Sequence, residues 1–247
     1  MDSWQFWIAA VGAATLVGMS KGGLPVVSML PVPLLALVLP PVTAAGLLLP
    51  VYVVSDMFGL LAYRRSFDKR VLAILIPATT IGIALGWATA AQVPERLVTG
   101  LIGLIGGVFA LTLLLRHRPQ QSERRAAVAP GLFWGAITGF TSFVSHAGAP
   151  PYQVYVLPLG LRKTVFAGTT TVLFAYVNAA KLVPYWALGQ LSLANLKVAA
   201  ILAVPASLAV LAGVWLVRIL PEALFFRLVT WALLAVSLRL LWMAAAG

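Results

Sequence analysis

Four ionisable side chains lie well inside apolar stretches of the sequence, at Lys21, Asp56, His146 and Lys181. If these stretches cross a bilayer, each charge costs about 2.5–3.5 kcal/mol on insertion scales and therefore needs a partner or a task. Lysine and histidine donate hydrogen bonds to anions, whereas a carboxylate pairs with them or carries a proton. The sequence thus points to anion binding or proton transfer inside a membrane.

Lys21 and His146 occupy the same place in two similar strings. Ser20–Pro25 reads S-K-G-G-L-P, and Ser145–Pro150 reads S-H-A-G-A-P. Glycine permits unusual backbone angles, and proline suits the first turn of a new helix. We expect each string to end one helix and start another, whose free N–H groups and positive dipole end face the break.

Two such breaks would form a pocket of cations, hydroxyls and N–H groups that suits a small oxyanion. The predicted substrate-binding residues are Ser20, Lys21, Gly22, Gly23, Ser142, Ser145, His146 and Gly148. The structural alternative is that Lys21 extends to a membrane interface and that His146 is an ordinary buried, hydrogen-bonded residue.

A second group, Asp56, Asn178 and Lys181, is predicted to form an ion pair or to couple protons. Lys181 lies about one helical turn beyond Asn178 and therefore shares its face. An Asp56–Lys181 pair would remove two isolated charges from lipid. The nearby Thr169–Thr171 could line a pathway, although threonine also packs between membrane helices.

The composition excludes an ordinary soluble domain. Of the 247 residues, 62% are hydrophobic and 9% are charged, and the mean hydropathy is +1.00, whereas soluble domains are about 25% charged. The net charge of +11 comes mostly from basic residues in short loops, as membrane orientation requires, so we expect the partners to be lipid and a small anion, not nucleic acid. We predict no cofactor and no metal site.

Ten apolar segments follow one another, at 4–20, 24–38, 43–62, 71–91, 97–115, 130–144, 150–160, 165–187, 197–217 and 223–243. We therefore predict an all-α polytopic membrane protein with about 8–10 transmembrane or re-entrant helical segments. The short, proline-rich segments 24–38 and 150–160 are the re-entrant candidates. The basic stretch 116–129 would be a cytoplasmic linker between transmembrane repeats at 1–115 and 130–247, which form one integrated domain.

Ordered matches indicate that the two halves are repeats. At offsets of about 122 to 128, the aligned pairs are Ala45-Gly46 with Ala167-Gly168, Asp56 with Asn178, Tyr63 with Tyr185, Pro77 with Pro205, Gly86 with Gly213, and Pro94-Glu95 with Pro221-Glu222.

Basic loops set the orientation of the halves. Loop 63–70 and the linker are rich in arginine and should be cytoplasmic, whereas loop 188–196, which matches 63–70, is uncharged. Conversely, loop 38–42 is uncharged, and its counterpart carries Arg162 and Lys163. This alternation predicts inverted-topology repeats with broken helices at the centre, both termini outward, and a multi-pass location in a bacterial inner (plasma) membrane. Such repeats are typical of secondary transporters, which work by alternating access at a midplane site.

The chain resembles the TauE/SafE-type sulfite exporter family, also called the toluene sulfonate uptake permease family. The resemblance spans essentially the whole chain and rests on the G-x-S-K-G-G-x-P run at Gly18–Pro25, its echo after Gly139, and the basic linker. It implies a small helical transporter, not an enzyme, that carries sulfite, organosulfonates or related sulfur-containing anions, with its site at the two breaks. His146-Ala147-Gly148-Ala149 replaces a fuller glycine run, so the choice among these anions stays open.

Two other functions remain alternatives. An intramembrane enzyme such as a lipid pyrophosphate phosphatase would need clustered carboxylates and arginines, but Asp56 is the one acidic residue deep in a segment. A purely structural subunit has little use for broken helices. The glycine face G-x-x-G-x-x-G that begins at Gly100 predicts close helix packing or a homodimer.

Overall fold

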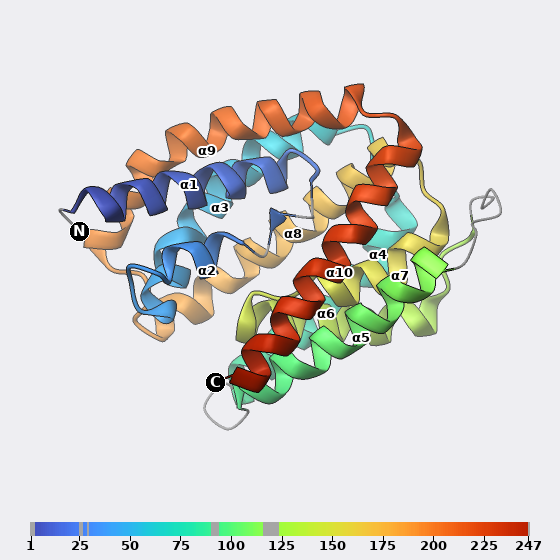
Figure 1. The fold of residues 1–247 in the computed structure, drawn as a ribbon, viewed down its shortest axis with the longest axis horizontal. Helices are drawn as coiled ribbons and strands as arrows, with labels where there is room; N and C mark the ends of the chain where they lie inside the picture. Colours follow the sequence, from blue (N-terminus) through green and yellow to red (C-terminus); the bar gives the residue numbers. More distant parts are fainter. Residues whose placement is uncertain (1–2, 25–26, 29, 90–93, 116–123, 247) are drawn as a thin grey trace. The chain divides into compact units, whose positions relative to one another are not determined.

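The computed structural model describes the chain except for residues 1–2, 25–26, 29, 90–93, 116–123 and 247, and except for the side chains of 41, 42, 95, 98, 102, 145 and 194. The described residues form ten α-helices (Figure 1): α1 (Trp4–Lys21), α2 (Pro31–Leu35), α3 (Pro41–Tyr63), α4 (Lys69–Thr89), α5 (Glu95–Leu115), α6 (Val128–Ser145), α7 (Ala149–Val156), α8 (Lys163–Ala187), α9 (Leu193–Ile219) and α10 (Glu222–Ala246). A 3-10 turn, Leu157–Leu159, extends α7.

The predicted all-α polytopic membrane class is confirmed. Five helical stretches of the described chain are long and apolar enough to cross a bilayer: Thr43–Tyr63, Lys69–Thr89, Lys163–Ala187, Asn195–Ile219 and Glu222–Ala246. Along α9, the large exposed side chains Ile201, Val204, Leu208, Leu211 and Trp215 recur every three or four residues. Such a stripe covers one helical face, which suits contact with lipid.

The chain folds into two compact units. Unit 1 comprises Met1–Phe67 and Ala167–Leu220, and unit 2 comprises Asp68–Phe166 and Pro221–Gly247. Each unit therefore takes helices from both of the predicted repeats.

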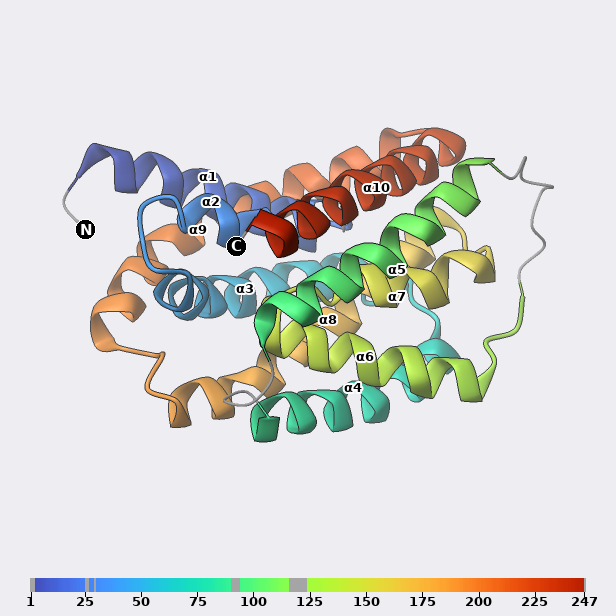
Figure 2. The ribbon, with the colours of Figure 1, turned by 60° about the horizontal axis from the view of Figure 1, so that its bottom comes forward.

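Unit 1 is built on close contact between α1 and α9, which run side by side in Figures 1 and 2, and α3 also packs against α9. A Cβ atom on Gly18 would overlap the carbonyl oxygen of Ala206, and one on Gly22 would lie 2.6 Å from the Cα of Gly213. Glycines four residues apart thus let the two backbones approach. The approach fixes the end of α1 against α9.

Unit 2 pairs α4 with α6 and α5 with α10. The glycine face of the 97–115 segment is occupied within this unit, because positions Gly103 and Gly106 face Ser237 of α10. The sequence predicted close helix packing or a homodimer for this face, and the structure shows close packing of α5 on α10.

Candidate functional site

The first predicted break lies at the end of α1, where glycine turns the chain. Gly23 has φ +101°, which is readily reached only by glycine. Its N–H donates to the carbonyl of Ser20 at 3.2 Å, and the N–H of Leu24 donates to the carbonyl of Met19 at 3.3 Å. This is a Schellman motif, and it stops the helix at Lys21.

The last two carbonyls of this turn are held by side chains from other helices. The Tyr63 hydroxyl of α3 donates to the carbonyl of Gly22 at 2.6 Å, and the Thr171 hydroxyl of α8 donates to that of Lys21 at 3.2 Å. Carbonyls buried away from water need such partners. These bonds hold the end of α1, and with it Lys21, at a fixed place.

The Lys21 side chain ends in a buried ion pair. Its Nζ lies 2.8 Å from Oδ1 of Asp56 on α3, and the side-chain amide of Asn178 on α8 donates to Oδ2 at 2.8 Å. Lys21, Asp56 and Asn178 are 5%, 1% and 5% exposed. Asp56 and Asn178, which the sequence aligned as repeat mates, are therefore bonded to each other.

Lys181 is the second buried lysine of this cluster. It is 1% exposed and interacts electrostatically with both Lys21 and Asp56. Each ammonium also lies over an aromatic ring, Lys21 at 5.1 Å from the ring centre of Tyr52 and Lys181 at 6.0 Å from that of Tyr185. Such cation–π contacts stabilise charge outside water.

The buried cluster carries more positive than negative charge. Among the side chains that the structure describes, the buried Lys, Arg, Asp and Glu residues are Lys21, Asp56 and Lys181. Fully ionised, they hold two positive charges and one negative, so one further negative charge would balance them.

The second predicted break, in unit 2, has a different geometry. α6 is followed by His146, which is partly buried and adopts the left-handed conformation with φ 51°. The next helix, α7, begins three residues later at Ala149, so the predicted restart is found here. Pro150 and Pro151 stand in its first turn and carry no N–H, which leaves this helix start with fewer donors than expected.

The restart expected at Pro25 after the first break falls on residues outside the described set. The first α-helix described after this break is α2, which begins at Pro31. Between them, the N–H of Val27 bonds to the carbonyl of Leu24 and that of Leu30 to the carbonyl of Val27, as in successive turns. Pro31 suits the start of α2 because a missing N–H costs nothing at a first helical position.

The predicted site residues divide between the two units. Unit 1 holds Ser20, Lys21, Gly22, Gly23, Asp56, Asn178 and Lys181, and unit 2 holds Ser142, Ser145, His146 and Gly148. The Ser20 hydroxyl donates to the carbonyl of Val17 at 2.7 Å, and Ser142 is buried. The side chain of Ser145 is outside the described set. The Lys21 side chain is buried against Asp56, so it does not follow the alternative in which it extends to a membrane interface.

Three tyrosines contact this cluster but were not predicted as site residues: Tyr52, Tyr63 and Tyr185. Tyr63 and Tyr185 were matched to each other as repeat mates, without a role at the site. Tyr52 precedes Asp56 by four residues, and Tyr185 follows Lys181 by four. Residues at this spacing share a helical face, so the helical period could have identified both. Tyr63 lies at the end of α3, 41 residues from the carbonyl that it binds, and its match with Tyr185 gave no sign of this contact.

The long apolar helices, the exposed apolar stripes and the buried charges define a multi-pass membrane protein with an intramembrane polar centre. The family model described as sulfite exporter TauE/SafE matches residues 7–240. The chain therefore belongs to this family of membrane transporters, which carry sulfur-containing anions such as sulfite, as the sequence resemblance predicted. No curated protein and no solved structure matches the chain.

Proposed function

We propose that this protein exports a small anion, sulfite or an organosulfonate, by alternating access. The charge of the buried cluster in unit 1 carries the proposal. Lys21 and Lys181 outnumber Asp56 in a place that excludes water, where unbalanced charge is expensive. A substrate with one negative charge would neutralise the cluster, and a neutral molecule would not.

Asp56 gives the cluster a means of coupling. In the structure its carboxylate occupies the position beside Lys21 that a substrate anion would otherwise take. Protonation of Asp56 would weaken this pair, make Lys21 available and raise the charge of the cluster from +1 to +2, so proton uptake would strengthen anion binding. We therefore assign substrate binding to Lys21 and Lys181, and assign proton coupling to Asp56.

Contacts between repeat mates support the inverted-repeat mechanism. Asp56 and Asn178 hydrogen bond to each other, as residues near a pseudo-two-fold axis do. The helix packing also repeats. In the two repeats α1 corresponds to α6 and α4 corresponds to α9; α1 packs on α9 in unit 1, and α6 packs on α4 in unit 2. The second break, with Ser142, Ser145, His146 and Gly148, belongs to the proposed transport path.

The membrane potential provides the direction. With the cytoplasm negative, each negative charge gains about 2.3 kcal/mol per 100 mV on leaving the cell. The potential therefore drives export through a protein in the inner membrane with its basic loops cytoplasmic and its termini outward. Proton binding at Asp56 then controls anion binding without having to supply the energy. A phosphatase is not favoured, because the buried cluster of described residues contains one carboxylate and no arginine.

Flux of labelled sulfite into proteoliposomes tests the proposal. Lys181→Met and Lys21→Met should each reduce the rate more than tenfold, because a lost 1.4 kcal/mol of anion binding already costs tenfold. Lys197→Met is the matched control, since Lys197 belongs to the same unit but is exposed on α9. If both buried-lysine variants fold and transport like the control, the assignment is wrong.

The charge balance has its own test. Asp56→Asn raises the charge of the cluster by one. Sulfate carries two negative charges and methanesulfonate carries one, so the variant should bind sulfate more strongly relative to methanesulfonate than the unmodified protein does. Competition of both ions against labelled sulfite, measured on purified protein, gives the ratio of the two affinities. An unchanged ratio in a folded variant would contradict the charge-matching argument even if transport itself were observed.

A further inference from the structure

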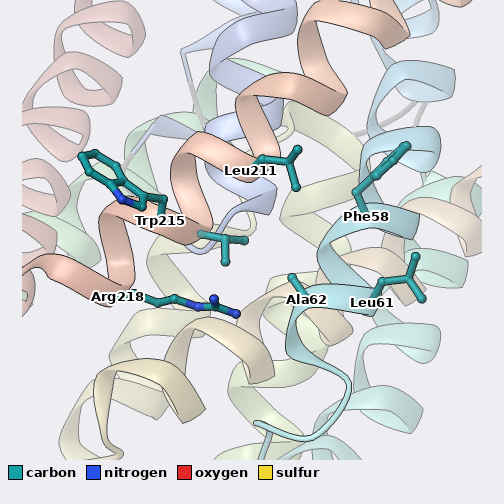
Figure 3. A pocket seen from close by; sticks show the side chains of 7 residues that line it. Phe58, Leu61, Ala62, Leu211, Trp215 and Arg218 are labelled. Carbon is teal, nitrogen blue, oxygen red and sulfur yellow. The ribbon is translucent and has the colours of Figure 1, made fainter.

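A groove with a volume of about 460 Å³ runs along unit 1 between α3 and α9 (Figure 3). Its walls include Phe58 and Leu61 of α3 and Leu211 and Trp215 of α9, and its charged lining residue is Arg218. Pockets that bind small molecules have volumes of about 300–1,000 Å³, so the groove is large enough for part of a lipid.

The walls of the groove are apolar and open. Leu61, Leu211 and Trp215 are 67%, 57% and 63% exposed. Large exposed hydrophobic side chains of a membrane-spanning helix face hydrocarbon, not water. A lipid acyl chain is therefore the chemistry that matches these walls.

The charged end of the groove lies where both helices finish. α9 ends at Ile219, directly after Arg218, and α3 ends at Tyr63, directly before Arg64 and Arg65. Figure 3 shows Arg218 extending from α9 across the groove toward Ala62, and it interacts electrostatically with Tyr63. One end of an apolar groove is thus positively charged.

The orientation of the chain places this end at the cytoplasmic surface. The loop that follows α3 carries Arg64, Arg65, Lys69 and Arg70, and such loops stay in the cytoplasm. The cytoplasmic leaflet exposes anionic headgroups, which basic pockets between transmembrane helices bind. The charge of the groove is therefore complementary to the lipid surface beside it.

We propose that the groove binds an anionic phospholipid, with an acyl chain along the apolar walls and the headgroup phosphate on Arg218. A guanidinium can donate two parallel hydrogen bonds to a phosphate, which an ammonium cannot match. This site is separate from the buried cluster and does not depend on the transported anion.

Native mass spectrometry of the full-length protein, titrated with phosphatidylglycerol or phosphatidylcholine, tests the proposal. The unmodified protein should retain phosphatidylglycerol more tightly. Arg218→Gln should weaken that retention about fivefold, which is the contribution that one arginine makes to binding at an anionic lipid surface. Arg227→Gln, which removes an exposed arginine near the start of α10 in unit 2, should leave it unchanged.

A second variant tests the apolar part. Ala62→Phe would fill the groove without changing its charge, and should weaken retention of phosphatidylglycerol while Arg218 is intact. The proposal is overturned if Arg218→Gln binds phosphatidylglycerol as tightly as the Arg227 control. It is also overturned if the groove variants abolish a dimer of the protein, or if an organosulfonate displaces the lipid, because another occupant would then be the natural one.

Discussion

The ends of α1 and α6 hold matching positions in the predicted repeats but differ in construction. After α1, the positive φ falls on Gly23, and the charged residue Lys21 is buried within the helix and paired with Asp56. After α6, the positive φ falls on His146 itself, which is only partly buried. A lysine buried in this way needs a partner, which Asp56 provides, whereas a histidine can become neutral. We interpret the first break as a paired charge and the second as an adjustable one.

The largest effect should come from removing the counter-charge of the first break. Asp56→Leu leaves two lysines buried without a carboxylate, and breaking such a pair costs about 3–5 kcal/mol. We expect a marked loss of thermal stability in detergent. The double variant Lys21→Met/Asp56→Leu should recover most of that loss, and a double variant as unstable as the single one would show that charge is not the cause.

Gly23 and Gly148 hold the same position in the two strings, and replacing each by alanine compares the backbone strain at the two breaks. Gly23→Ala should destabilise the protein by about 2–3 kcal/mol, because the positive φ strains an alanine and its Cβ would meet the Tyr63 hydroxyl at 2.5 Å. Gly148, the matching glycine, has φ −73°, so Gly148→Ala should cost less. Equal losses in melting temperature would remove the proposed difference between the breaks.

Tyr63→Phe removes the hydroxyl that caps the carbonyl of Gly22. A buried carbonyl without its donor costs about 1–3 kcal/mol. The control is Tyr155→Phe, because Tyr155 donates to the carbonyl of Ala127 at 2.9 Å in a less buried setting. Chemical unfolding of both variants should show the larger loss for Tyr63, and the opposite order would contradict a tightly bonded first break.

The smallest expected effect is a gain. His146→Gly relieves the left-handed conformation of a side-chain-bearing residue, which costs about 1–2 kcal/mol, so melting in detergent should occur at a slightly higher temperature. The same variant loses the titratable group. If export at low and at neutral pH is the same in the unmodified protein and in this variant, His146 is not the adjustable charge.

The sequence by itself determined the membrane class, the ten helical segments and the identity of the buried charges. These follow from local rules: apolar length predicts a span, glycine and proline mark interruptions, and a charge in lipid stands out against its neighbours. The pairing of Asp56 with Asn178 also agrees with a match that was visible in the alignment of the halves.

Only the tertiary structure decided which lysine lies 2.8 Å from Asp56 and that α1 packs on α9. Lys181 was as good a partner as Lys21 by residue type. The choice depends on the rotation of α1, α3 and α8 about their axes and on close glycine contacts. A uniformly apolar sequence encodes these weakly, because lipid-facing and protein-facing positions carry the same residues.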